Sequence, residues 1–216
     1  MARDIRKGLK KLSVGTFFVT IVATLPLWLF GVWIKDIVST YAYTEKSGVE
    51  SVDNSLSEYY QLCDQSESEV KIEEIEKGLV PELIKIDKAR INHSIVSVPL
   101  KQGTWKVYDG VANYAEETSL INTNGGNIGI YGHDKEEVFS SIKILQTGDV
   151  IELYSGNYKA IYKVVESKVS DPQNVSVFYE TENPTVTLVT CDGRFSQQRY
   201  VIQAEFDKIV ELNCMN

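Results

Sequence analysis

Short β-forming runs dominate the chain after Pro81, and they constrain its fold more than any other feature. The runs are rich in Val, Ile, Thr and Tyr, and turn-forming residues separate them. They cover residues 83–86, 91–98, 126–131, 150–154, 158–165, 185–190 and 200–206. Ser155-Gly156-Asn157 joins two of them as a hairpin signal. So many strands in about 140 residues predict a mainly β domain, built as a small closed barrel of about eight strands with one or two short helices.

The segment 135–145 is the run with the clearest helical period. Its apolar side chains would share one face of a helix: Val138, Phe139, Ile142 and Leu145. Gly148 follows as a stop signal, and Asp134 precedes the run with Glu137 three residues later. We therefore expect a helix over 135–145 whose N-terminus is capped by Asp134.

A 21-residue stretch without charge, residues 14–34, precedes the β-rich part. At about 1.5 Å per residue, a helix of this length spans roughly 30 Å of hydrocarbon. Residues 1–13 carry five basic and one acidic side chain, so the positive-inside rule places this tail in the cytoplasm. The run is longer than the apolar part of a signal peptide, and a charged Lys35-Asp36 pair follows it. We expect an uncleaved, single-pass anchor with the rest of the chain outside the cell.

Residues 35–79 separate this anchor from the predicted β-rich domain, residues 80–216. The stretch 35–78 holds eleven acidic and four basic residues and little apolar surface, which favours a tether or stalk. A regulatory segment that folds over the active site is the alternative. The net charge of −8 contains +4 from the first 13 residues (five basic minus one acidic), so residues 14–216 carry −12. Such an acidic chain has no electrostatic footprint for nucleic acid.

The chain has three cysteines, and an odd count in an exported protein argues against a disulfide framework. The sequence leaves open a disulfide bond between Cys63 and Cys214. Their positions, one in a polar linker and the other two residues from the end, favour the interpretation that both are incidental.

Cys191 lies in a different context, at the end of the β-branched run 185–190. A polar loop follows it, and Arg199 opens the next run, while Gly132-His133 ends an earlier one. A thiol attacks as its thiolate, which nearby cations favour. Strand ends that hold a thiol, an imidazole and a guanidinium together therefore predict a cysteine acyl-transfer enzyme.

These residues resemble a known pattern, that of the sortases, the membrane-anchored cysteine transpeptidases of mainly Gram-positive bacteria. The likeness runs from about Pro81 to Phe206. Its elements are Gly132-His133, then Phe139-x-x-Ile142-x-x-Leu145-x-x-Gly148-Asp149, then Thr187-Leu188-Val189-Thr190-Cys191, then Arg199.

The resemblance implies that Cys191 attacks a C-terminal sorting signal of the LPxTG kind, between its Thr and its Gly. An acyl-enzyme would form, and an amine from a cell-wall precursor or a pilin lysine would resolve it. His133 would protonate the departing amine and Arg199 would stabilise the oxyanion or hold the peptide. The partners would be surface proteins with sorting signals, and no cofactor is needed for these steps.

Two further residues are candidates for substrate binding. Thr190 either lines the substrate pocket or simply favours the strand. Arg194 competes with Arg199 for the third catalytic role, but it lies in the loop after Cys191, whereas Arg199 opens a strand.

The resemblance also raises a calcium site, because some sortases bind calcium between carboxylates of two loops. Glu116 and Glu117 resemble the first element, and Glu180 or Glu182 would supply the second. Ser119 and Asn122 stand where further carboxylates would be expected, so few hard oxygen ligands are visible. We favour solvated surface charge at these positions.

Two other functions use the same residues. A membrane-anchored hydrolytic cysteine protease has the same groups, but papain-like enzymes carry Cys before His, and here His133 precedes Cys191. A non-catalytic surface-binding barrel would make the order of thiol, imidazole and guanidinium a coincidence.

Overall fold

A computed structural model of the chain describes residues 55–63, 67–68, 75, 77–193 and 197–212. All of them belong to one compact unit, Gly48–Asn216. Nine strands lie within the described residues: β1 (Glu67–Ser68), β2 (Leu83–Ile86), β3 (Ile91–Val98), β4 (Ala112–Ala115), β5 (Asn127–Tyr131), β6 (Val150–Ser155), β7 (Tyr158–Ser170), β8 (Thr185–Asp192) and β9 (Gln198–Leu212). Three short 3₁₀ helices join them: η1 (Asp87–Ala89), η2 (Ser140–Ile144) and η3 (Val175–Phe178).

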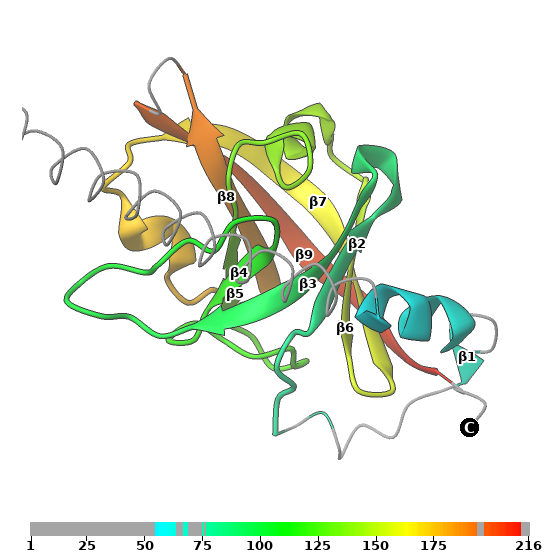
Figure 1. Cartoon of the computed structure of the whole chain (residues 1–216). Helices are drawn as coiled ribbons and strands as arrows, with labels where there is room; N and C mark the ends of the chain where they lie inside the picture. Colours follow the sequence, from blue (N-terminus) through cyan, green and yellow to red (C-terminus); the bar gives the residue numbers. More distant parts are fainter. Residues whose placement is uncertain (1–54, 64–66, 69–74, 76, 194–196, 213–216) are drawn as a thin grey trace, which may run out of the picture. The chain divides into compact units, whose positions relative to one another are not determined.

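Eight of the described strands close into a barrel (Figure 1). Their order is β9-β7-β6-β2-β3-β4-β5-β8, and β8 pairs again with β9 to close the ring. The pairs β3–β4 and β5–β8 are parallel, and the other pairs of the ring are antiparallel. The prediction of a mainly β, closed barrel of about eight strands is confirmed.

The barrel interior is filled by the apolar residues that alternate along these strands. Ile84, Ile130, Leu153, Leu188 and Ile202 are each fully buried in this core. Strand β4 is not among the predicted runs, since Ala-Asn-Tyr-Ala has little intrinsic strand preference. Its pairing with β3 on one side and β5 on the other makes it a strand.

The helix predicted over 135–145 is wrong in its type. Turns and the short η2 replace it, and Asp134 does not cap a helix: its carboxylate accepts a hydrogen bond from Lys143 Nζ at 2.8 Å. The predicted apolar face is nevertheless buried, with Val138, Phe139 and Ile142 at most 1 % exposed. Burial of these side chains against the barrel, rather than helical periodicity, determines how the segment folds.

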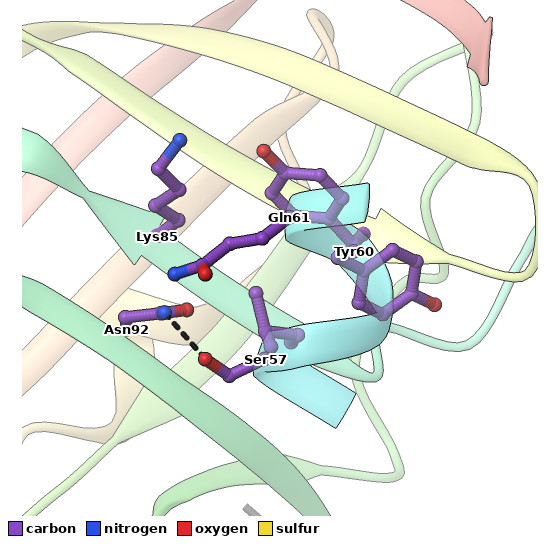
Figure 2. A pocket seen from close by; sticks show the side chains of 7 residues that line it. Ser57, Tyr60, Gln61, Lys85 and Asn92 are labelled. Atoms are coloured by element: carbon purple, nitrogen blue, oxygen red, sulfur yellow. Dashed lines mark hydrogen bonds between the residues drawn. The ribbon is translucent and has the colours of Figure 1, made fainter. Parts of the chain in front are cut away.

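A helix at 55–63 packs against the barrel, in the stretch where the composition favours a stalk (Figure 1). Tyr60 is 3 % exposed, and its ring lies 4.8 Å from that of Tyr154 on β6. Its hydroxyl donates to Glu82 Oε2 at 2.6 Å, and Asn92 Nδ2 donates to Ser57 Oγ at 2.8 Å (Figure 2). The folded unit therefore extends further toward the N-terminus than the domain start expected at residue 80.

The interpretation of Cys63 as incidental is wrong. Cys63 is 1 % exposed, packs in the same apolar cluster as Tyr60 and Leu212, and is disulfide-bonded. Cys214 lies outside the described residues. The error follows from treating 55–63 as a polar linker, since a docked helix brings its cysteine against the barrel wall.

The predicted anchor, residues 14–34, lies outside the described residues. Among the helices that the structure describes, none is long and apolar enough to cross a membrane.

The docked helix generates a stability prediction. In a protein of residues 48–216, Tyr60→Ala should lower the free energy of unfolding by about 3–5 kcal/mol, because it removes a buried aromatic ring. Tyr59→Ala is the matched control: Tyr59 is 43 % exposed, so its loss should stay below about 1 kcal/mol. Urea unfolding followed by circular dichroism measures both, and equal losses would contradict the docking of this helix.

Candidate active site

Strand β8 lies between β5 and β9, and this arrangement brings the predicted catalytic residues to one end of the barrel. Cys191 is the penultimate residue of β8, and Arg199 is the second residue of β9. In the antiparallel register the two are direct cross-strand partners. Such partners have Cβ atoms about 5 Å apart, so the thiol and the guanidinium arise from neighbouring points of the sheet.

His133 reaches the same level from the other side of β8. Strands β5 and β8 run parallel, with Tyr131 opposite Val189, so His133 and Cys191 stand two residues beyond this pair on each chain. The Gly132 N–H donates to the Val189 carbonyl at 3.1 Å, which continues the ladder past the end of β5. The structure therefore brings together the three residues predicted from the sequence.

Position 132 requires a glycine, because two side chains approach its backbone closely. A Cβ at this position would lie 2.9 Å from Val138 Cγ1 and 3.1 Å from the Phe139 ring. The buried segment after His133 thus folds back directly onto the glycine before it, and the Phe139 N–H donates to the His133 carbonyl at 3.1 Å. The tight turn holds the backbone of His133 between the strand and this segment.

The candidate catalytic residues remain accessible. His133, Cys191 and Arg199 are all half-buried, and Cys191 is a free thiol. Arg199 Nη1 also donates to the carbonyl of Gln198 at 3.0 Å, which holds part of its side chain near the strand start. Each of the three side chains is therefore partly open to solvent.

Thr190, a candidate either for the substrate pocket or for the strand alone, makes a structural contact. It is 1 % exposed, and its hydroxyl donates to the Gly132 carbonyl at 3.0 Å. This side chain offers no surface to a substrate, and it ties β8 to the His133 turn. Arg194, the other candidate for substrate binding, lies outside the described residues.

Sequence reasoning missed the charged groups around the turn at His133. Asp109, in the connection between β3 and β4, accepts from Lys135 Nζ at 2.7 Å. The Lys135 hydrogen bond lowers the pKa of Asp109, and the nearby His133 adds to this effect. The carboxylate is thus close enough to interact with the imidazole, although nothing in the linear spacing of these residues indicates it.

An aromatic cluster lies on the outside of the barrel beside the site. The Trp105 ring is 5.8 Å from Phe178 of η3 and 6.4 Å from Tyr131 of β5. Asn127 Nδ2 donates to the carbonyl of Val177 at 2.9 Å, which holds η3 against β5. These side chains cover the outer face of β5 and β8, so both faces of β8 are buried.

The carboxylates considered for calcium do not gather into a site. Both oxygens of Glu117 accept hydrogen bonds, from Leu100 N–H at 2.6 Å and from Trp105 Nε1 at 2.7 Å. The Leu100 bond, followed by the Trp105 bond, lowers the pKa of Glu117. In the part of the chain that the structure describes, which includes Glu116, Glu180 and Glu182, no three His, Cys, Asp or Glu side chains form a group that could hold a metal ion. Glu117 instead secures the loop after β3.

Comparisons with known proteins identify the family. The family model of the sortase domain matches residues 84–207. Sortase A of Listeria monocytogenes is 26 % identical over 200 residues, covering 86 % of this chain and 88 % of that protein.

Solved structures support the same fold. A Clostridium perfringens sortase D5 transpeptidase superposes with a TM-score of 0.55 and 24 % identity, over 75 % of this chain and 99 % of that one. Sortase E1 of Streptomyces coelicolor, solved with a tripeptide in its active site, gives 0.53 and 22 %, over 63 % of this chain and 93 % of that one. The matched residues include most of the barrel together with His133, Cys191 and Arg199, and the chain belongs to the sortase family of cysteine transpeptidases.

Proposed function

We propose that the chain cleaves an LPxTG-like C-terminal sorting signal with Cys191 and transfers the protein to an amine acceptor. The observation that carries this proposal is the register around β8, which pairs Cys191 with Arg199 on one side and aligns it with His133 on the other. Sortases act in general on proteins that carry sorting signals, and family membership supports the same class of substrate here.

The chemistry proceeds in two acyl-transfer steps. The Cys191 thiolate attacks the Thr carbonyl carbon of the Thr–Gly peptide bond in the signal, and a tetrahedral oxyanion forms. Arg199 donates hydrogen bonds to this oxyanion or to the peptide beside it. When the C–N bond breaks, a thioester remains on Cys191 and His133 gives a proton to the departing amine.

The second step reverses the roles of these groups. The amine of a cell-wall precursor or a pilin lysine attacks the thioester carbonyl, and His133 accepts a proton from it. The C–S bond then breaks, and Cys191 leaves as the thiolate. Water in place of the amine gives hydrolysis, so the acceptor distinguishes a transpeptidase from a protease.

The nucleophile is tested with Cys191→Ala. Incubation of residues 48–216 with LPxTG-like peptides should give a covalent adduct on Cys191 in the wild type, detected by mass spectrometry, and none in the variant. The circular dichroism spectrum should be unchanged, because the substitution removes a sulfur at a half-exposed strand end. An adduct that persists in Cys191→Ala would exclude this thiol as the nucleophile.

The arginine is tested in the same assay. Arg199→Lys should lower kcat/KM by about 100-fold or more, the usual effect of losing an oxyanion donor, because lysine keeps the charge without the planar fork. Arg194→Lys is the matched control and should retain most of the activity. Similar losses at the two positions would mean that charge alone matters or that Arg194 has the catalytic role.

The membrane anchor and the external location of the domain belong to the same proposal. Residues 14–34 are uncharged and follow a basic tail, which supports a single-pass anchor with a cytoplasmic N-terminus. The disulfide-bonded Cys63 is consistent with an oxidising compartment outside the cytoplasm. A tether in the same bilayer as the apolar tails of its substrates raises their local concentration.

Protease accessibility tests this topology. Protease added to intact cells that express the full chain should remove the domain and leave a membrane fragment containing residues 14–34. Protection of the domain until lysis would reverse the orientation, and a mature N-terminus after residue 34 would show cleavage instead of anchoring.

A further inference from the structure

One lysine connects the residues that follow His133 and Cys191. Lys143 Nζ contacts the carboxylate of Asp134 at 2.8 Å and that of Asp192 at 3.1 Å. Asp134 comes directly after His133 in the chain, and Asp192 directly after Cys191. A single ammonium thus bridges the backbone segments of the candidate acid and the candidate nucleophile.

A second link lies on the other side of the same two residues. Thr190, before Cys191, bonds through its hydroxyl to the carbonyl of Gly132, before His133. His133 and Cys191 are therefore the middle residues of two triplets that are joined at both ends. The first joint is a buried hydrogen bond within the sheet, whereas the second depends on Lys143.

Strand β9, which carries Arg199, also contacts Lys143. Tyr200, which follows Arg199, has its hydroxyl 3.5 Å from the backbone carbonyl of Lys143, a long hydrogen bond. Asp134, Asp192 and Tyr200 thus all contact Lys143. Its neighbour Ile142 is buried and fixes η2 to the barrel.

The carboxylates of Asp134 and Asp192 need the positive charge of Lys143 beside them. The side chains of Asp134, Lys143 and Asp192 are 32, 29 and 26 % exposed, so solvent screens them less than it does an open surface pair. Burial lowers the pKa of Lys143, but its hydrogen bonds with Asp134 and Asp192 outweigh burial and raise it. The Lys143 hydrogen bond in turn lowers the pKa of Asp192. Lys143 and Asp192 are therefore both charged at neutral pH.

We infer that Lys143 is a positioning residue for the transpeptidation reaction: its two ion pairs hold His133 and Cys191 in register and neutralise the carboxylates beside them. The inference rests on the proposed function for its effect on turnover. Its effect on the Cys191 thiol is independent of any substrate.

Loss of the lysine has two physical consequences. The turn at His133 loses its link to the end of β8, and a displacement of about 1 Å between reacting groups can reduce turnover by about 100-fold. The two carboxylates also become unpaired near the thiol, where negative charge disfavours the thiolate. Among the described residues, Asp192 follows Cys191 on β8, and Arg199 is its cross-strand partner on β9. His133 is aligned with Cys191 after β5, and Lys143 holds Asp134 close to Asp192.

The first experiment measures the rate of Cys191 alkylation by iodoacetamide against pH in residues 48–216, with the adduct located by mass spectrometry. In Lys143→Met the midpoint should move to higher pH. Lys143→Arg should restore it, because a guanidinium can pair with both carboxylates. Lys163→Met is the matched control, because it removes a 2.8 Å ion pair with Asp207 between β7 and β9. In this variant the midpoint of alkylation should not move.

The second experiment uses peptide cleavage. Lys143→Met should lower kcat about 10-fold to 100-fold with little change in KM, since the lysine is argued to position the reacting groups and not to bind the peptide. The triple variant Asp134→Asn, Lys143→Met, Asp192→Asn removes the unpaired charges without restoring the link. It should return the alkylation midpoint toward the wild type while kcat stays low.

The inference is overturned if Lys143→Met matches Lys163→Met in both assays, or if the triple variant recovers full kcat. Should Lys143→Met fail to fold, Asp134→Asn replaces it, because that variant leaves the Lys143–Asp192 pair in place and must still lower kcat. A wild-type protein that cleaves no sorting peptide would refute the proposed function, whereas the alkylation profiles would still decide the role of Lys143.

Discussion

The double pairing of β8 is the constraint on which the rest of this structure depends. β8 runs parallel to β5 and antiparallel to β9, and these two pairings close the barrel. The same register brings the end of β5, the end of β8 and the start of β9 to one place. The proposed nucleophile, acid and oxyanion donor are therefore supplied by three strands without any long loop to position them. A rigid sheet suits this purpose, because a small displacement of reacting groups has a large effect on rate.

Both faces of β8 are covered, which explains why its first six residues, threonines as well as valines and a leucine, are all buried. Leu188 points into the barrel core, whereas Val189 packs in the outer cluster with Tyr131 and Phe178. Around this rigid strand, polar contacts set the finer geometry: the Thr190 hydroxyl on Gly132, and Lys143 between two carboxylates. Packing thus places the strand, and a few hydrogen bonds and ion pairs orient its end.

The segment before the barrel is partly a structural element. The helix at 55–63 buries Tyr60 and Cys63 against β2, β6 and β9, although its neighbours in the sequence are strongly acidic. Composition averaged over 35–78 hides this, because two buried side chains on one helical face hardly change the mean.

The sequence by itself determined the elements that depend on local chemistry. Alternating β-branched runs predict most strands, and the order of His133, Cys191 and Arg199 predicts the site, because strand period and residue type are local properties. Only the tertiary structure decided which distant groups meet. Ala112–Ala115 becomes a strand through its neighbours, and Glu117 serves the loop at Trp105. Residues 135–145 fold by burial into turns and a 3₁₀ helix and not into an α-helix. Lys143 joins Asp134 to Asp192 across 58 positions of the sequence (192 − 134), a contact that closure of the barrel alone creates.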